Sequence, residues 1–344
     1  MPGTLQSVKS AALETYISLC SSDARRIRAI DERQEQRCRP QNDELHIRAA
    51  LDWLCRAHDV GTDDGVSAMF SFAEGWLGSY PETTGYIIPT FYDLARRFDN
   101  EEYAERAAEM ARWLSSLQTR DGAFPGSFLG QLSSPRVFNT GQVIFGLVRA
   151  VAETGQDRFL EAAVRAGDWL ISQQDADGAW RRSTFSEIVH AYNVRTAWAM
   201  AELAAISGEQ RFREAAVRNA QWVLDQQDHS GWFRNNTFNA REQAASLHTI
   251  AYATRGLLEI GAAAGRQEFV DGADRAASAL YRGWRLYDGI GGAYGRDWCV
   301  SAPWRCLPGE AQLAVVWMRL DQLTKKDTYK DAAVTLLDRV KAAQ

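Results

Sequence analysis

The chain has 344 residues, of which 46% are hydrophobic and 24% are charged, and its formal net charge is −5 at pH 7. This composition is that of a globular protein and excludes a disordered chain. No run approaches the roughly 20 consecutive apolar residues of a transmembrane helix, so we expect no membrane span. The excess of acidic over basic residues argues against nucleic-acid binding, which favours a basic surface.

The first twenty residues, MPGTLQSVKSAALETYISLC, lack the basic stretch and apolar core of a secretory signal. The five cysteines are an odd number without a dense framework, which favours reduced thiols. Cys299 and Cys306 have no His between them, so a zinc site is not expected there. We therefore expect a cytoplasmic protein that uses neither a metal nor another cofactor.

Residues 1–42 form a segment of their own, with a helical pattern from about Leu5 to Gln34. From residue 43 to residue 344 the sequence repeats. The two clearest copies are Arg165–Trp180 and Arg218–Phe233, in which Trp, a Gln-Gln-Asp triplet and Gly occupy matching positions. The tryptophans that mark successive copies, 60, 56 and 53 residues apart, are Trp53, Trp113, Trp169 and Trp222.

Each copy predicts a pair of helices. The first is amphipathic, because Phe159, Ala163 and Ala166 follow the three- and four-residue spacing of one helical face, and Asp-Gly then ends it. The second is apolar on nearly all sides, as in residues 192–206, which predicts a buried helix. Side-chain amides and a packed indole are expected to tie the first helix to the loop of its neighbour. The residues expected to do so are Gln173, Gln174, Gly178 and Trp180.

The repeat contains six amphipathic and five apolar helices, and the N-terminal segment offers a twelfth. Helix pairs stacked in one dimension bury their apolar faces only against neighbours, in an open solenoid or in a closed ring. The count and the very apolar second helices favour the ring. We therefore expect an all-α, single-domain (α/α)6 toroid, in which residues 43–344 form the toroid and residues 1–42 close it.

Two segments resemble known families. Arg165–Trp180 resembles the repeat of terpenoid cyclases, in which a basic residue, an aromatic-aliphatic pair, Gln and Gly-x-Trp recur. Ser79–Tyr86 (SYPETTGY) is similar to uncharacterised bacterial toroid proteins found with polysaccharide genes. Over about residues 43–344, these resemblances imply the α/α toroid superfamily. Its members include terpenoid cyclases, protein prenyltransferase β-subunits and many carbohydrate-active enzymes.

The isoprenoid motifs are incomplete in this chain. Asp175-Ala-Asp177-Gly178 lacks the last Asp of the Asp-x-Asp-Asp acid of terpenoid cyclases. Asp297 and Cys299 resemble two zinc ligands of prenyltransferases, but no His follows them. The resemblance therefore supports the scaffold more than the isoprenoid chemistry.

In a ring of helix pairs, all the inner helices start at the same mouth. Their free N–H groups and positive dipole ends favour anionic or oxygen-rich ligands, so we expect the site among the residues at or beside these helix starts. The expected catalytic residues are Glu82, His190, Asn193, His248 and Tyr252. The expected substrate-binding residues are Trp76, Tyr80, Thr83, Tyr86, Asn139, Thr140, Tyr192, Arg195, Trp232, Tyr294, Trp304, Glu310 and Gln312.

Three reactions fit these residue types. A polysaccharide lyase needs a group that neutralises a uronate and a base such as Tyr252 for the C5 proton. An epimerase needs a pair of bases, for which His190 and His248 are suited. A glycosidase needs two carboxylates, of which Glu82 is the first choice. N-capping is the structural alternative for Thr140 and Asn193.

We expect a carbohydrate-active enzyme that acts on an oligo- or polysaccharide by elimination, hydrolysis or epimerisation. The expected partner is a carbohydrate or another small-molecule substrate. Two alternatives stay open: a terpenoid or prenyl enzyme, and a non-catalytic binding module, since a fold does not fix a function. The sequence predicts neither the sugar nor the oligomeric state.

Overall fold

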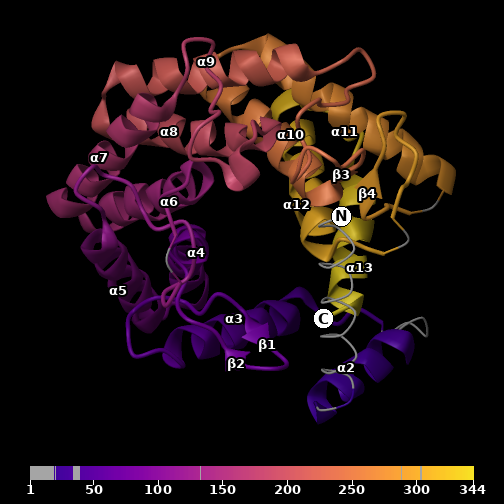
Figure 1. Ribbon diagram of the computed structural model, residues 1–344. Helices are drawn as coiled ribbons and strands as arrows, with labels where there is room; N and C mark the ends of the chain where they lie inside the picture. Colours follow the sequence, from indigo (N-terminus) through magenta and orange to yellow (C-terminus); the bar gives the residue numbers. More distant parts are fainter. Residues whose placement is uncertain (1–18, 20, 34–38, 132, 288, 303) are drawn as a thin grey trace.

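The computed structural model describes residues 19, 21–33, 39–131, 133–287, 289–302 and 304–344, and eleven of its helices, α3 to α13, surround a common axis (Figure 1). The outer layer consists of α3 (Asp43–Asp59), α5 (Glu101–Leu117), α7 (Asp157–Gln173), α9 (Gln210–Gln226), α11 (Gln267–Tyr287) and α13 (Lys330–Ala342). The inner layer consists of α4 (Pro81–Phe98), α6 (Val137–Thr154), α8 (Val194–Ser207), α10 (Leu247–Ala264) and α12 (Leu307–Thr324). The expected α/α toroid and its six amphipathic and five apolar helices are confirmed for these residues.

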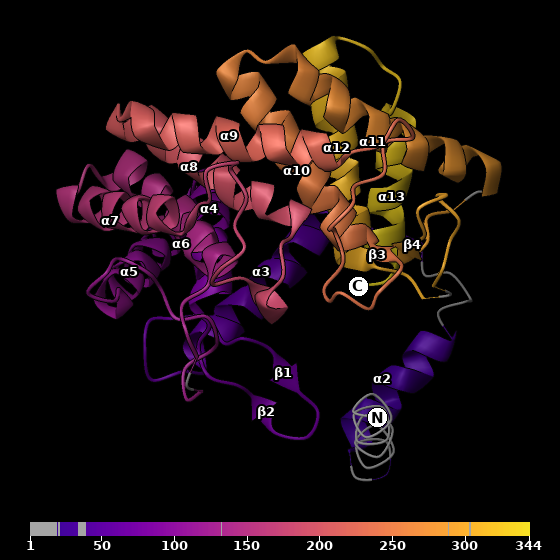
Figure 2. The same ribbon diagram turned by 45° about the horizontal axis from the view of Figure 1, so that its top comes forward.

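The outer layer is joined end to end. Lys341 Nζ of α13 lies 2.8 Å from Asp43 Oδ1 of α3, and Gln344 Nε2 donates to the His46 carbonyl at 3.1 Å. These contacts bring the first and last outer helices together, as a closed ring requires. Helix α2 (Ser22–Arg33) lies outside the ring (Figure 2). Ring closure by residues 1–42 stays a prediction, because residues 1–18, 20 and 34–38 lie outside the described residues.

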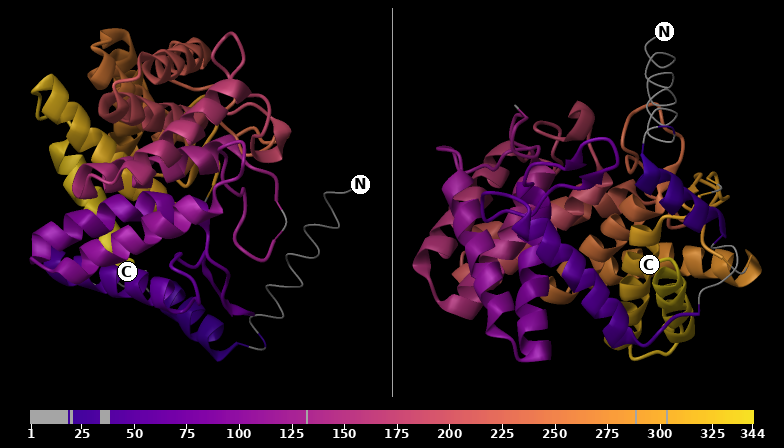
Figure 3. Two further views of the ribbon diagram at one scale, coloured as in Figure 1. Left: turned by 90° about the vertical axis from the view of Figure 1, so that its left-hand side faces the viewer. Right: turned by 90° about the horizontal axis from the view of Figure 1, so that it is seen from below.

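All the inner helices begin at one end of the ring, where the connecting loops gather (Figure 3). Short strands brace these loops. β1 (Phe70–Ser71) pairs antiparallel with β2 (Gly75–Trp76), and β3 (Ala245–Ser246) pairs with β4 (Ala293–Tyr294). Two 3-10 turns, Phe185–Glu187 and Ala191–Asn193, lead into α8. This end of the ring is called the mouth below.

Inner helices approach each other closely where glycine replaces a side chain. A Cβ atom on Gly85 of α4 would lie 2.6 Å from the Gln142 carbonyl oxygen of α6. Such a contact is far below van der Waals distance, so only glycine permits this spacing. The close packing fixes how the starts of α4 and α6 face each other across the mouth.

A repeated hydrogen-bond clamp ties each outer helix to the next. Gln174, at the end of α7, donates from Nε2 to the Gly178 carbonyl at 3.1 Å and to the Ala215 carbonyl of α9 at 3.0 Å. Its Oε1 accepts from Arg218 of α9 at 2.9 Å. Gly178 has φ +91°, and a Cβ there would lie 2.4 Å from the Arg218 carbonyl oxygen.

The same clamp recurs in the two neighbouring repeats. Gln118 contacts the carbonyls of Gly122 and Ala162 and the side chain of Arg165. Gln227 contacts the carbonyls of Gly231 and Gly272 and the side chain of Arg275. The expected tie between outer helices is therefore present, although the amide reaches the neighbouring helix itself rather than its loop.

Trp180 is packed as expected, but its hydrogen bond is to α7, the outer helix of its own repeat. Its ring is fully buried, and its Nε1 donates to the Leu170 carbonyl at 2.9 Å. Gln173 takes no part in the clamp and instead contacts Ser172 and Ser183.

We predict that Gln174→Ala lowers the free energy of unfolding by about 2–3 kcal/mol, because it removes a side chain that makes three hydrogen bonds. The adjacent Gln173→Ala is the matched control and should cost less than about 1 kcal/mol. Denaturant unfolding of both variants measures the difference. Equal losses for the two glutamines would contradict the clamp.

Candidate active site

A cavity of about 630 Å³ lies at the mouth. The starts of α4, α6 and α10 and the loops before α4, α6, α8 and α10 form its walls. The sequence-predicted residues that line it are Tyr80, Glu82, Thr83, Tyr86, Asn139, Tyr192, His248 and Tyr252. The toroid therefore brings together residues at or just before the starts of four inner helices, α4, α6, α8 and α10, which lie up to 172 positions apart in the chain, from Tyr80 to Tyr252.

Glu82 lies in the first turn of α4, within a short hydrogen-bonded chain. Tyr80 Oη donates to Glu82 Oε2 at 2.6 Å, and Asn139 Nδ2 of α6 donates to Tyr80 Oη at 2.8 Å. Burial raises the pKa of Glu82, although the Tyr80 hydrogen bond and the charge of Arg195 lower it in part. A carboxyl group with a raised pKa is suited to general acid catalysis.

His248 is a neutral imidazole beside Tyr252, one turn along α10. The two ring centroids are 4.3 Å apart. Burial, and then the charge of Arg195, lower the pKa of His248 to about 4. Its Nδ1 is buried without a hydrogen-bond partner among the described residues. Because the ring is uncharged at neutral pH, it can accept a proton from a substrate in the cavity.

Arg195, the second residue of α8, lies next to Tyr252 but does not line the mouth cavity. Its Nε donates to Gln142 Oε1 at 2.7 Å, and its guanidinium lies 4.7 Å from the centroid of the Tyr252 ring. The described residues place no carboxylate within ion-pair distance of it. Together with Gln312, Arg195 lines a second cavity of about 280 Å³ rather than the mouth cavity. Its charge lowers the pKa of His248 and opposes the rise in the pKa of Tyr252 that burial causes.

His190 and two other predicted residues at the mouth support the walls instead of lining the cavity. The ring of His190 is buried, with Nδ1 2.9 Å from the Thr237 carbonyl oxygen and Nε2 2.7 Å from the Phe185 carbonyl oxygen. Thr140 Oγ1 accepts from the Phe124 backbone N–H at 3.3 Å. Asn193 is buried in the turn before α8, and its Nδ2 has no partner among the described residues.

Five other predicted residues also lie outside the cavity lining. Glu310 is fully buried, and its two oxygens accept from Arg305 at 2.9 and 2.7 Å. Trp232 packs edge-on against Trp298, with 5.4 Å between centroids. Tyr294 accepts from a backbone N–H, Trp304 is exposed beside Gly292, and Trp76 lies in strand β2. The local contacts of Glu310, Trp232 and Tyr294 account for their burial without a ligand.

The loops supply cavity residues that the sequence analysis missed. Phe185 and Phe238 stand in the loops before α8 and α10, with centroids 6.2 Å apart. Arg136, just before α6, donates to the Thr184 carbonyl at 2.6 Å and also lines the cavity. Each of these residues precedes an inner helix. Because every repeat places its loop at the same mouth, this position in the sequence could have predicted them as cavity residues. Phe138, expected from the sequence as an aromatic residue beside the inner loops, also lines the cavity, and the other lining residues not predicted are Ala68, Met69, Gly126, Ser127, Phe128, Gln131, Ser133 and Thr249.

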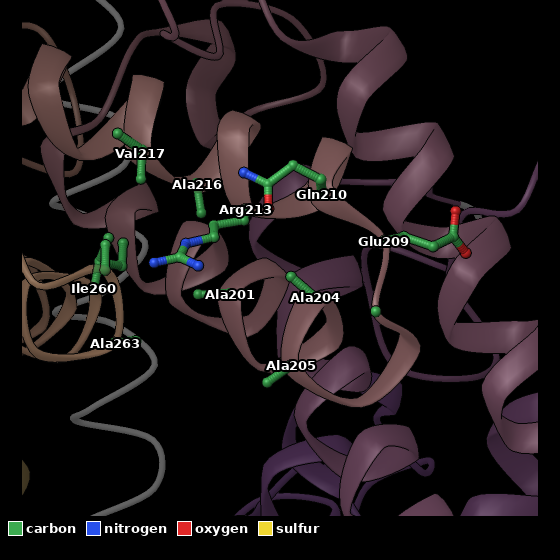
Figure 4. A pocket seen from close by; sticks show the side chains of 12 residues that line it. Ala201, Ala204, Ala205, Glu209, Gln210, Arg213, Ala216, Val217, Ile260 and Ala263 are labelled. Atoms are coloured by element: carbon green, nitrogen blue, oxygen red, sulfur yellow. The ribbon is translucent and has the colours of Figure 1, made fainter.

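Another hollow of about 280 Å³ lies where α8 and α10 end and α9 begins, away from the mouth (Figure 4). Alanines such as Ala201 and Ala204 form much of its lining. Arg213 and Gln210 extend over them, while Glu209 points away. No lining residue is a histidine or a tyrosine. The mouth cavity is therefore the stronger candidate for an active site.

The described residues contain no helix long and apolar enough to span a membrane. Within the same residues, no group of three or more His, Cys, Asp or Glu side chains is placed to hold a metal ion. Cys55, Cys299 and Cys306 are free thiols. The cytoplasmic location remains a prediction.

Residues 92–254 match the family of the squalene-hopene cyclase C-terminal domain. No curated protein gives a significant match to the chain. The match covers less than half of the 344 residues, so it shows similarity to that family over the central repeats.

Solved structures give similarity over most of the chain. An unsaturated glucuronyl hydrolase specific for heparin has 14% identity and a TM-score of 0.69, covering 86% of this chain and 82% of its own. Cellobiose 2-epimerase from Bacillus thermoamylovorans has 13% identity and a TM-score of 0.70, covering 86% of each chain. D-mannose isomerase has 14% identity and a TM-score of 0.68, covering 86% and 84%. At these identities the likeness shows the fold, and together with the family match over residues 92–254 it agrees with the expected resemblance to α/α toroid proteins.

We predict that the imidazole of His248 titrates near pH 4 in the folded protein, well below its value of about 6.5 in an unfolded chain. The unfolded state then binds the proton first, so this residue reduces stability as pH falls from about 6.5 to 4. Over that range, the loss attributable to His248 is at most about 3 kcal/mol. NMR titration, with the resonance assigned from His248→Gln, measures the pKa. A midpoint near 6.5 would contradict a ring that its surroundings hold neutral.

Proposed function

We propose that the chain is a carbohydrate-active enzyme, and that the mouth cavity binds a sugar unit and moves a proton at a carbon next to its carbonyl or carboxyl group. The observation that carries this proposal is the pair of Glu82 and His248 in one cavity, with pKa values shifted in opposite directions. Groups whose environments shift their pKa values in this way are suited to acid and base roles at one pH.

His248 is the proposed base. Its neutral ring takes the proton from carbon, and the electron pair moves toward the adjacent carbonyl oxygen to give an enediol-type intermediate. Glu82, as the proposed acid, returns a proton to the other face of the carbon and inverts its configuration, as an epimerase requires; proton exchange with solvent then restores both groups. Alternatively, the electron pair expels the oxygen at the next carbon, and Glu82 supplies the proton that this leaving oxygen needs.

Tyr252 and Arg195 support this proton transfer. Tyr252 lies against the His248 ring and lines the cavity, while the Arg195 guanidinium stands behind it. The positive charge of Arg195 keeps His248 neutral and favours negative charge that develops nearby.

Two-carboxylate hydrolysis has less support. Glu82 is the one carboxylate among the described lining residues, whereas retaining and inverting glycosidases both use a pair. The carboxylates Asp63 and Asp64 line a separate surface hollow beside α3 and α5. Terpenoid chemistry also has less support, because Glu82, His248, Asn139 and Arg136 give the cavity a polar lining.

The lining and the structural neighbours support a sugar as the substrate. Phe138 packs 5.5 Å from both Tyr192 and Tyr252, so aromatic faces stand beside the polar groups. Ligand cavities of this kind combine apolar walls with a few placed polar groups. The three neighbours named above are, by their names, a glucuronyl hydrolase, an epimerase and an isomerase, all of which process sugars on this fold.

We expect the parent protein to catalyse exchange of a sugar C–H proton with deuterium in D₂O for some member of a panel of reducing sugars and uronate-containing oligosaccharides. NMR measures the exchange, and ultraviolet absorbance detects an unsaturated elimination product. His248→Gln and Glu82→Gln should each lower the rate by about a hundredfold or more, because each removes an acid-base group.

His229→Gln is the matched control, because it removes an exposed imidazole outside the cavity lining and should leave the rate unchanged. Folding of each variant is checked by circular dichroism. A His248→Gln protein that keeps its rate within a few-fold of the parent would exclude His248 as the base. Absence of exchange, elimination and hydrolysis across the panel would overturn the enzyme proposal.

A further inference from the structure

Large apolar side chains stand exposed on a surface next to the mouth. Trp53 of α3 is 45% exposed, and Phe70 and Phe72 of the β1–β2 hairpin are 38% and 37% exposed. Trp76 of β2 stands between them and is partly buried. These four residues, Trp53, Phe70, Phe72 and Trp76, are called the aromatic platform. A cluster of exposed aromatic rings on one surface usually marks a binding site.

The aromatic platform is held in a fixed arrangement. The rings of Trp53 and Trp76 have centroids 4.7 Å apart, and Phe70 lies 5.4 Å from Trp76 and 6.0 Å from Phe72. The hairpin beneath them is hydrogen-bonded, with Leu77 N–H donating to the Met69 carbonyl at 3.0 Å. Rings that are already ordered lose little conformational freedom when a ligand covers them.

The platform continues the wall of the mouth cavity. Ala68 and Met69 line that cavity, and the next residue, Phe70, begins the platform. The other strand leads in a few residues to Tyr80 and Glu82, which also line the cavity. The β1–β2 hairpin projects at the same end of the ring as the mouth loops (Figure 2). A ligand longer than the cavity would therefore lie over these rings.

We propose that the aromatic platform is a subsite for further sugar units of an oligo- or polysaccharide whose reacting unit occupies the mouth cavity. This inference rests on the proposed function. The C–H faces of sugar rings pack on flat aromatic side chains, and the platform provides several such faces in sequence. Exposed carboxylates at Asp52 and Glu74, beside Trp53 and within the hairpin, disfavour an anionic lipid surface as the occupant.

The test is a chain-length series measured by isothermal titration calorimetry. The probes are cello-oligosaccharides and oligogalacturonides, each from the disaccharide to the hexasaccharide. Affinity of the parent should rise with chain length in the series that binds. Trp53→Ala should weaken hexasaccharide binding by about tenfold, because one stacked ring is lost, and should leave disaccharide binding unchanged.

Two further variants make the result decisive. Phe72→Ala removes a ring at the edge of the platform and should also weaken hexasaccharide binding without changing disaccharide binding. It replaces Trp53→Ala in the test if that variant does not fold. Tyr287→Ala, on outer helix α11, removes a ring that is 77% exposed and outside the cavity lining, and should change neither affinity.

The outcomes separate this inference from the proposed function. Disaccharide binding or turnover without any gain from added units would overturn the platform subsite and leave the enzyme proposal intact. Equal loss of disaccharide and hexasaccharide affinity in the variants would also overturn it, because the rings would then only support the cavity wall. If the parent neither binds nor converts any sugar, the proposed function fails and the subsite fails with it.

Discussion

The clamp between consecutive outer helices is the interaction on which the architecture depends. A glutamine at the end of one helix satisfies carbonyl groups in its own turn and in the next outer helix, and an arginine of that helix binds the same amide. The glycine in the turn must have a positive φ and no side chain, because the neighbouring backbone lies against it. The clamp fixes the distance and angle between repeats, and their regular succession curves the chain into a ring.

The ring in turn determines where chemistry can occur. Since every inner helix begins at the same end, short polar segments from distant repeats become neighbours there without any local sequence motif. The surroundings of the titratable side chains at the mouth then shift their pKa values. Burial raises the pKa of Glu82 and lowers that of His248 to about 4, so the surroundings disfavour the charged form of each group. Neutral groups can be buried at the mouth without the cost of an unpaired ion.

Much of this arrangement could be predicted from the sequence, because helical periodicity and repeated Gln, Gly and Trp positions are local signals. The same repeats placed Tyr80, Glu82, His248 and Tyr252 at helix starts, and these residues do line the mouth cavity. The sequence did not show which cavity of the ring each side chain faces. Arg195 is the second residue of α8 and Gln312 is the sixth of α12, yet both face a different cavity from Tyr252, the sixth residue of α10. Glu310 shows another limit, because its partner Arg305 lies in a loop whose path depends on the folded ring.

The loops were the least predictable part of the site. Phe185 and Phe238 come from irregular segments, and their contact with each other depends on two separate repeats meeting at the mouth. His190 explains how those segments are held. Its two ring nitrogens face carbonyl oxygens at Phe185 and Thr237, in the same two loops. A histidine at an inner helix start was a reasonable candidate for catalysis, but both of its nitrogens face carbonyl oxygens of the protein and the ring does not line the cavity.

Arg195 lines the second cavity, and its charge acts on His248 in the mouth cavity. Arg195 is partly buried, and in place of a carboxylate its guanidinium contacts an amide oxygen and three aromatic rings, those of Tyr252, Phe145 and Trp198. Its positive charge is therefore not cancelled locally and extends into the mouth cavity, where it acts on both His248 and Glu82. A substrate that develops negative charge beside His248 would supply the missing counter-charge. The unpaired positive charge of Arg195 favours an anionic intermediate over a cationic one. Proton abstraction from a sugar therefore agrees better with the site than the carbocation chemistry of terpenoid cyclases.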